Sequence, residues 1–152
     1  MTTIAAIDPG AQGAIALFAD GELYDLADMP LTRHIGWAHN IPDANAVRAI
    51  VEVCDLVVIE VPQPRPGNGM GSVAASLASW GTLLGACHGI GVRLVTPAVW
   101  TKALGVGADK TVHRRAADAL YPGRDWFSRR KDDGRADAVL IGHWWLTRGK
   151  AT

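Results

Sequence analysis

The chain has few cysteines, few phenylalanines and tyrosines, and no net charge. Only two of its 152 residues are cysteines, Cys54 and Cys87, and neither lies in a CxxC pair or has a histidine at ligand spacing. We therefore expect two buried thiols in a reducing compartment, rather than a disulfide or a zinc site. No apolar run is long enough to span a bilayer, and the N-terminus lacks the basic start and apolar stretch of a signal peptide. The sequence predicts a cytoplasmic protein with no membrane partner and no organic cofactor.

The composition is that of an ordinary globular protein. Apolar residues make up 49% of the chain, and glycine and proline are spread along it rather than clustered. A chain of 152 residues can bury one substantial core but is too short for two ordinary domains. No internal repeat or linker interrupts it. We therefore predict a single domain over residues 1–152.

The zero net charge conceals an uneven distribution along the chain. Residues 1–92 carry three basic and nine acidic side chains, whereas residues 93–152 carry twelve basic and six acidic ones. The second part could bind a polyanion while carboxylates in the first part hold cations. Random scatter over a solvated surface explains the same counts equally well.

The apolar pattern predicts an α/β fold. Three short apolar runs over 3–8, 13–18 and 22–27 read as an antiparallel meander, and Asp20-Gly21 is a strong two-residue hairpin signal. The β-branched run over 55–61 has the pattern of a central strand buried on both faces. The remaining predicted elements are a strand over 91–95 and helices over 44–53, 72–88, 97–104, 109–120 and 133–146. We expect a mixed five-stranded sheet flanked by helices, with irregular segments over 30–42 and 62–72.

Four carboxylates stand where a divalent ion could be held. Asp8 ends the first predicted strand, and Glu60 interrupts the apolar strand over 55–61. Strand ends that face a crevice are where α/β sheets bind ligands, and a charge among apolar residues needs a cation or a cleft. Asp133 and Asp137 lie four residues apart, on one face at the start of the last predicted helix. If that helix packs beside the first strand, the four carboxylates converge.

Hard oxygen ligands of this kind suit Mg²⁺, for which Mn²⁺ can substitute. Two such ions about 4 Å apart can activate a water and stabilise the leaving 3′ oxygen in an in-line displacement at a phosphodiester. Simpler interpretations exist for single members of the set. Asp8 precedes Pro9-Gly10 and suits a turn, and Asp133 suits a helix cap. The combination is more specific than any one residue.

With these motifs the chain resembles the RuvC family of Holliday junction resolvases, within the RNase H-like nucleases. The resemblance covers nearly the whole chain and implies an RNase H-like fold and a Mg²⁺-dependent endonuclease that cuts four-way DNA junctions. It also implies that Asp8, Glu60 and Asp137 are the first, second and last metal ligands. The motifs that carry it, in chain order, are Ile7-Asp8-Pro9-Gly10, Val58-Ile59-Glu60, the segment GVGADK over 105–110, and Ala136-Asp137-Ala138.

One position departs from the family pattern. The family's third acidic ligand usually lies three residues before the last, which is Gly134 here, while Asp133 lies four before and Asp132 five before. We predict that Asp133 is the fourth ligand, because a helix cap can absorb a one-residue shift, and Asp132 is the alternative. The resemblance further implies that Lys110 faces the scissile phosphate, where a cation offsets the negative charge of the transition state.

Basic side chains in the second part of the chain can form a track for DNA phosphates. Phosphate contacts position DNA without reading its sequence, and solvated helix faces are the alternative for each residue. In resembling proteins the loop over 62–70 contacts the junction centre, where Met70 or Arg65 could enter a base step; a flexible loop without that role fits equally well. The predicted track consists of Lys102, Lys110, His113, Arg114, Arg115, Arg129, Arg130, Lys131 and Arg135.

A four-way junction has approximate two-fold symmetry, so paired nicks need two matching sites, which a C₂ homodimer supplies. The predicted helix over 72–88 carries a stripe of small residues that lets another helix approach closely. We predict that this stripe is the dimer interface, and an internal contact with the sheet is the alternative. The six tryptophans are expected to fill the core or the interface. The small residues of the stripe are Ala74, Ala78, Gly81 and Gly85.

The sequence leaves other functions open. An actin-like ATPase or kinase also uses an Asp-x-Gly after its first strand, as in Asp8-Pro9-Gly10, but such proteins need two related domains. A catalytically weak or inactive junction-binding protein would explain the departure at Gly134. A nuclease acting on other branched DNA, or on RNA–DNA hybrids, would use the same chemistry.

Overall fold

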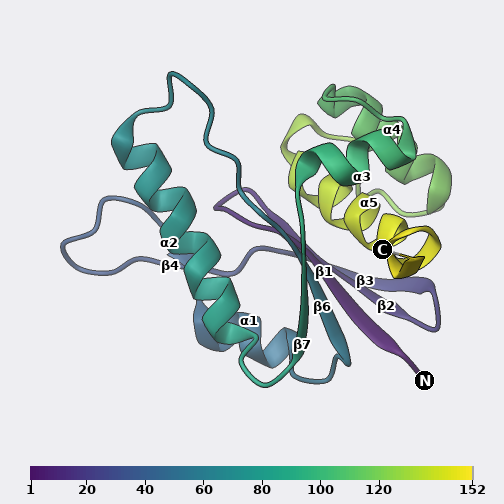
Figure 1. Ribbon diagram of the computed structural model, residues 1–152, viewed down its shortest axis with the longest axis horizontal. Coiled ribbons are helices and arrows are strands. Elements are labelled where there is room, and N and C mark those ends of the chain that lie inside the picture. Colours follow the sequence, from purple (N-terminus) through teal and green to yellow (C-terminus); the bar gives the residue numbers. More distant parts are fainter. Residues whose placement is uncertain (152) are drawn as a thin grey trace.

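A mixed five-stranded sheet with helices on both faces forms the centre of the computed structural model, which describes residues 1–151 (Figure 1). The strand order is β3-β2-β1-β6-β7. β1, β2 and β3 are antiparallel neighbours, whereas β6 and β7 run parallel to β1. This architecture confirms the predicted fold. The strands are β1 (Thr3–Asp8), β2 (Ala14–Ala19), β3 (Glu22–Asp28), β6 (Leu56–Glu60) and β7 (Gly91–Val95).

The hairpin between β2 and β3 turns at Asp20 and Gly21, as predicted. Both residues have positive φ, 49° and 91°. A two-residue turn of this hand matches the right-handed twist of the flanking strands. Turn chemistry therefore favours the hairpin that joins β2 to β3, and β1 is central because it pairs with β2 on one side and with β6 on the other.

Helices α1 (Ala44–Val51) and α2 (Met70–Ala86) cover one face of the sheet (Figure 1). Asp43 caps α1 as expected, because its carboxylate accepts the backbone N–H of Asn45 at 3.0 Å. Cys54 and Cys87 are free and buried in the apolar cluster on this face, which confirms the expectation of buried thiols.

Three of the four small residues of the α2 stripe face solvent, and Ala78 is half-buried. A Cβ built on Gly81 or Gly85 would meet no atom within 4 Å, and Ala74 is exposed. The two glycines therefore make no internal contact with the sheet. A second copy of the chain as the occupant of this stripe stays a prediction.

Helices α3 (Pro97–Leu104), α4 (Lys110–Leu120) and α5 (Asp133–Thr147) cover the other face. Most of α5 is buried, because it lies between the sheet and the two other helices. Two short 3₁₀ turns flank it, Arg130–Asp132 before and Gly149–Ala151 after. A membrane-crossing helix is absent from the part of the chain that the structure describes, since each helix is too short or too polar.

The segment over 30–42 differs from the prediction of an irregular connection. It forms a small ladder of its own, in which β4 (Leu31–Thr32) pairs with β5 (Ile41–Pro42). Each strand has only two residues, so no alternating pattern could signal it. The resulting hairpin projects beside α2 (Figure 1).

Candidate functional site

Asp8 and Glu60 lie side by side at the carboxyl ends of β1 and β6, two adjacent inner strands of the sheet. Ile7 pairs with Ile59 in the parallel ladder of β1 and β6, so the next residue on each strand falls at the same level. The residues before them on both strands are buried and apolar. The two carboxylates are therefore the first polar groups reached as these strands leave the core.

Close backbone packing brings α5 to the same end of the sheet. A Cβ on Gly134 would lie 2.0 Å from the carbonyl oxygen of Gln12, and one on Gly142 would lie 2.2 Å from the ring of Phe18. The helix can therefore lie directly against the turn after β1 and against β2 only because both positions lack a side chain. Asp137 lies between these two glycines and is 2% exposed.

The electrostatics of Asp8 show that the carboxylates converge. Burial, and then the charges of Asp137 and Glu60, raise the pKa of Asp8 well above its ordinary value, while Lys110 acts in the opposite direction. Burial also raises the pKa of Glu60, against the hydrogen bond that it accepts and with the help of Asp137. The carboxylates of β6 and α5 thus lie close enough to Asp8 of β1 to oppose its ionisation.

Lys110 supplies the opposite charge. Its ammonium group donates a hydrogen bond to Oδ2 of Asp137. Burial alone would lower the pKa of Lys110, but Asp137, Asp8 and Glu60 outweigh it and raise the pKa. The lysine is therefore charged and lies among all three carboxylates.

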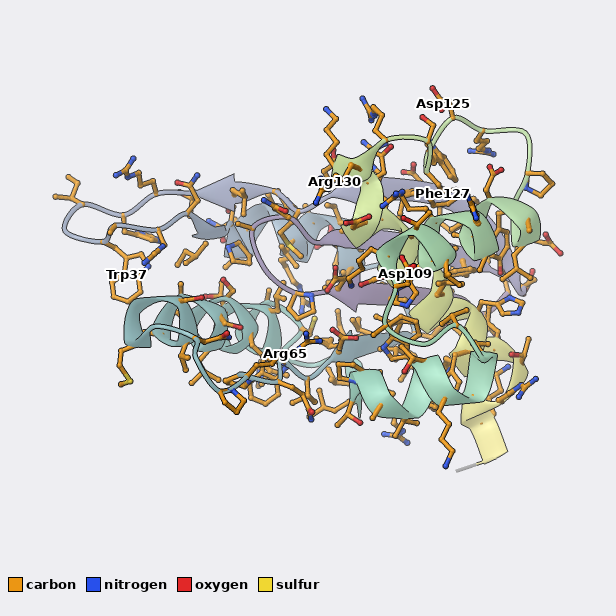
Figure 2. The ribbon with its side chains drawn as sticks, turned by 90° about the horizontal axis from the view of Figure 1, so that it is seen from above. Trp37, Arg65, Asp109, Asp125, Phe127 and Arg130 are labelled. Atoms are coloured by element: carbon orange, nitrogen blue, oxygen red, sulfur yellow. The ribbon has the colours of Figure 1, made fainter. Side chains whose placement is uncertain are left out.

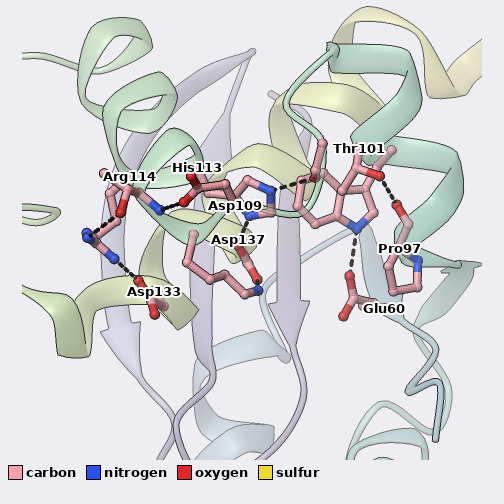
Figure 3. A network of polar contacts seen from close by, with 12 residues as sticks. Glu60, Pro97, Thr101, Asp109, His113, Arg114, Asp133 and Asp137 are labelled. Carbon is pink, nitrogen blue, oxygen red and sulfur yellow. Dashed lines mark hydrogen bonds and ion pairs between the residues drawn. The ribbon is translucent and has the colours of Figure 1, made fainter. Parts of the chain in front are cut away.

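His113 holds the other oxygen of Asp137. Its Nδ1 lies 2.7 Å from Oδ1 of Asp137, and its Nε2 lies 2.9 Å from the carbonyl oxygen of Gly107 (Figure 3). Burial favours the neutral ring, but these two bonds outweigh it and raise the pKa of His113. Both partners are acceptors, so both bonds are satisfied only when each ring nitrogen carries a proton.

Trp100 binds Glu60 in a corresponding way. Its indole Nε1 donates to Oε2 of Glu60 at 2.6 Å (Figure 3). The tryptophan is 1% exposed and its ring meets the ring of His113 edge to face, with 5.2 Å between centroids. A contact 40 residues apart in sequence therefore joins α3 to the end of β6.

These groups open into one cleft of about 630 Å³. Glu60, Lys110 and Asp137 line it together with Arg65 from the loop after β6, whereas Asp8 is not among the lining residues. The donor set of three carboxylates is hard and anionic, which suits a divalent cation such as Mg²⁺. Within residues 1–151 no three Asp, Glu, His or Cys side chains are already disposed as a metal cage. The Lys110 ammonium occupies Oδ2 of Asp137, so a cation that binds this oxygen would displace it.

Comparison with known proteins gives a relative and a fold. No protein-family model matches the chain. The chloroplastic Holliday junction resolvase MOC1 of Chlamydomonas reinhardtii is 40% identical over 93 residues, which cover 58% of this chain and 10% of the relative. The chain thus spans about a tenth of the length of this curated relative.

Two solved structures of Thermus thermophilus RuvC superpose on nearly the whole chain. The one in complex with Holliday junction substrate has a TM-score of 0.64 over 99% of this chain and 96% of that chain, at 17% identity. The chain has the fold of RuvC. The second RuvC structure has a TM-score of 0.56 and covers 97% of each chain at 16% identity.

Within this RuvC fold, the structure does not place Asp133 with the other three carboxylates. Asp133 is the first residue of α5 and forms an ion pair with Arg114 of α4 (Figure 3). Its charge is not among those acting on Asp8. Asp132, the alternative, is 1% exposed and bonded to the side chain of Arg129 at 3.0 and 3.1 Å. Asp133 as the fourth ligand therefore stays a prediction that requires its bond to Arg114 to open.

The predicted phosphate track divides into two groups. Arg114, Arg129 and Arg135 form ion pairs with Asp133, Asp132 and Asp28 respectively. His113 does not belong to the track, because it is 2% exposed and bonded at both nitrogens. Arg130 projects from the turn before α5, and Arg65 from the loop after β6 (Figure 2). Of the predicted track, the exposed residues without an ion pair in the described part of the chain are Lys102, Arg115, Arg130 and Lys131.

Trp100 was not predicted as a residue of the site, and His113 was predicted as a phosphate contact rather than as a partner of Asp137. His113 follows Lys110 by three residues on α4, a spacing that places both on one helix face, so a signal was available. The sequence signal for Trp100 was weaker. A buried indole needs an acceptor, but nothing in the sequence shows that this acceptor is Glu60.

Proposed function

We propose that this chain is a metal-dependent endonuclease that resolves four-way (Holliday) DNA junctions by paired phosphodiester hydrolysis. The observation that carries the proposal is the meeting of Asp8, Glu60 and Asp137 with Lys110 at one end of the sheet. The RuvC fold over nearly the whole chain and a relative named as a Holliday junction resolvase support it.

Asp8, Glu60 and Asp137 are the proposed ligands of two Mg²⁺ ions, which Mn²⁺ can replace, and Asp133 is the proposed fourth ligand. When bound, such ions polarise the phosphate and lower the pKa of a water molecule toward neutral pH. Lys110 lies on the open side of the cluster and lines the cleft. Its ammonium can therefore contact a phosphate oxygen that gains negative charge during the displacement.

The DNA is proposed to lie over the cleft and the exposed basic side chains around it. Lys102, Arg115, Arg130 and Lys131 are available for phosphate contacts, and Arg65 reaches the cleft from the loop after β6. Met70 begins α2 and is 85% exposed, so it can enter a base step at the junction centre. A homodimer through the solvent-facing stripe of α2 would supply two matching sites.

The decisive experiment is cleavage of a labelled four-way junction in Mg²⁺ by the wild type and Glu60→Gln. Linear duplex and an RNA–DNA hybrid of the same sequence are the substrate controls. We expect paired nicks in the junction from the wild type and none from the variant, because a neutral amide at Glu60 is a poor ligand for a hard cation. Nicking that survives in Glu60→Gln would contradict the proposed role of this carboxylate.

A junction-binding protein with weak or absent cleavage is the second candidate. The ion pair between Asp133 and Arg114 favours it, because it leaves three carboxylates at the cluster. A gel shift on the junction without nicks in the presence of Mg²⁺ would support this alternative.

The cytoplasmic location expected from the sequence remains a prediction, and the relative is named as chloroplastic.

A further inference from the structure

Each of two carboxylates in the cluster has one oxygen held by a buried donor from another helix. Oε2 of Glu60 accepts the indole N–H of Trp100 at 2.6 Å, and Oδ1 of Asp137 lies 2.7 Å from Nδ1 of His113. The carboxylates come from β6 and α5, whereas the donors come from α3 and α4. Neither bond is a local consequence of helix or strand geometry.

The two donors are themselves fixed. Trp100 and His113 are 1% and 2% exposed, and their rings touch edge to face at 62°. The second nitrogen of His113 lies 2.9 Å from the carbonyl oxygen of Gly107, in the turn between α3 and α4. The two buried rings therefore pack against each other, and neither side chain can turn without breaking a hydrogen bond.

We propose that Trp100 and His113 are positioning residues that set the orientation of the Glu60 and Asp137 carboxylates for cation binding. The inference rests on the proposed function, because it takes these carboxylates to be ligands. Both carboxylates also line the cleft. The second oxygen of Glu60 can therefore face a cation there, and so can Oδ2 of Asp137 once Lys110 leaves it. Groups that orient ligands in this way typically contribute 10- to 100-fold to metal affinity.

The test is Mn²⁺ binding in the absence of DNA, measured from the electron paramagnetic resonance signal of free Mn²⁺. Trp100→Phe keeps an aromatic ring but removes the N–H. We expect it to raise the Mn²⁺ dissociation constant by roughly 10- to 100-fold. Trp144→Phe is the matched control, because Trp144 is buried in the same core cluster and its indole bonds neither carboxylate among the described contacts. It should bind Mn²⁺ as the wild type does.

His113 provides a second, independent comparison should Trp100→Phe fail to fold. His113→Leu removes both ring nitrogens, whereas His113→Asn places an amide N–H near the position of Nδ1. We expect the leucine variant to lose Mn²⁺ affinity and the asparagine variant to recover most of it. Thermal unfolding followed by circular dichroism reports whether each variant folds. Equal Mn²⁺ affinity in His113→Leu, His113→Asn and wild type would overturn the proposal.

The hydrogen bond between Trp100 and Glu60 can also be tested without metal, by nuclear magnetic resonance. The indole N–H resonance that is absent from the spectrum of Trp100→Phe belongs to Trp100. We expect Glu60→Gln to shift this resonance, because the acceptor loses its charge. An unshifted resonance would also overturn the proposal. Junction nicking by Trp100→Phe at wild-type Mn²⁺ affinity would overturn the positioning role alone. A wild type that binds Mn²⁺ with the expected variant losses but never nicks junctions would overturn the proposed function alone.

Discussion

The backbone of Gly134 lies directly against the carbonyl group of Gln12, so that a Cβ on Gly134 would stand 2.0 Å from that oxygen. This contact leaves no room for an acidic side chain at Gly134, three residues before Asp137. No side chain fits there without moving α5 away from the turn after β1. The same contact keeps Asp137, one turn further along α5, close to Asp8.

We therefore expect Gly134→Ala to destabilise the protein by about 1–3 kcal/mol, as overpacking against an immobile backbone does. Urea unfolding measures the loss. Gly71→Ala is the control, because a Cβ there would make only an ordinary contact, 3.7 Å from a ring nitrogen of His39. Equal unfolding free energies for the two variants would show that α5 does not need this close approach.

Asp8 should make the metal-free protein less stable as the pH rises. Burial and the neighbouring carboxylates raise its pKa in the folded state, so the folded protein holds this proton to a higher pH than the unfolded chain does. The loss of folding stability caused by ionising Asp8 is absent below the pKa that Asp8 has in the unfolded chain. It develops as the pH rises through the raised pKa that Asp8 has in the folded protein. We expect Asp8→Asn to be more stable than wild type at neutral pH in a metal chelator.

The measurement is urea unfolding of both proteins at pH 7.5 and at pH 4. The advantage of Asp8→Asn should shrink at the lower pH, because wild-type Asp8 is then protonated to a greater extent. Asp20→Asn, at the exposed hairpin turn, provides a comparison away from the cluster. An advantage of Asp8→Asn that does not change with pH would indicate a cause other than the charge.

Lys110→Met should lower the rate of junction nicking by roughly 100- to 1000-fold, the usual effect of removing one group that stabilises transition-state charge. Single-turnover kinetics with saturating protein isolates this step from DNA binding. Lys150→Met removes an exposed lysine in the C-terminal 3₁₀ turn and should leave the rate unchanged. A similar rate for both variants would remove Lys110 from the proposed chemistry.

Asp133 and Asp132 should respond differently to amide substitution. If the Asp133 carboxylate joins the metal site, Asp133→Asn should reduce the nicking rate by roughly 100-fold. This corresponds to an increase of about 2.7 kcal/mol in the activation free energy. Asp132→Asn should instead lower stability by about 1–3 kcal/mol, because Asp132 is buried and bonded to Arg129. Nicking rates and urea unfolding of both variants separate the two roles. Wild-type nicking by Asp133→Asn would leave the site with three carboxylates.

The solvent-facing stripe of α2 should control the oligomeric state. Gly81→Glu places a charge where the structure shows open space, so it should leave the fold intact and shift the protein toward monomer. Sedimentation velocity measures the shift. Ala49→Glu, on the exposed side of α1, is the control and should sediment as wild type. A wild type that is monomeric at every concentration would rule out a stable dimer through α2.

Local patterns accounted for much of the fold. The hairpin at Asp20 and Gly21, the cap of α1 at Asp43 and the start of α3 at Pro97 lie where neighbouring residues predict them. The ladder of β4 and β5 was not predicted, because pairs of two residues show no periodicity. The start of α2 at Met70 also preceded the predicted position by two residues.

At the candidate site, too, some features were predictable from the sequence and others depended on the packing of the helices. The residue pattern is enough to show which carboxylates are available and that Asp8 and Glu60 end two strands, since a lone charge beside apolar residues is visible without a structure. Tertiary structure alone decided that Asp137 joins them, that Asp133 pairs with Arg114, and that Trp100 and His113 hold the cluster. These relations depend on how α3, α4 and α5 pack on the sheet, and packing joins residues far apart in the chain that no local spacing connects.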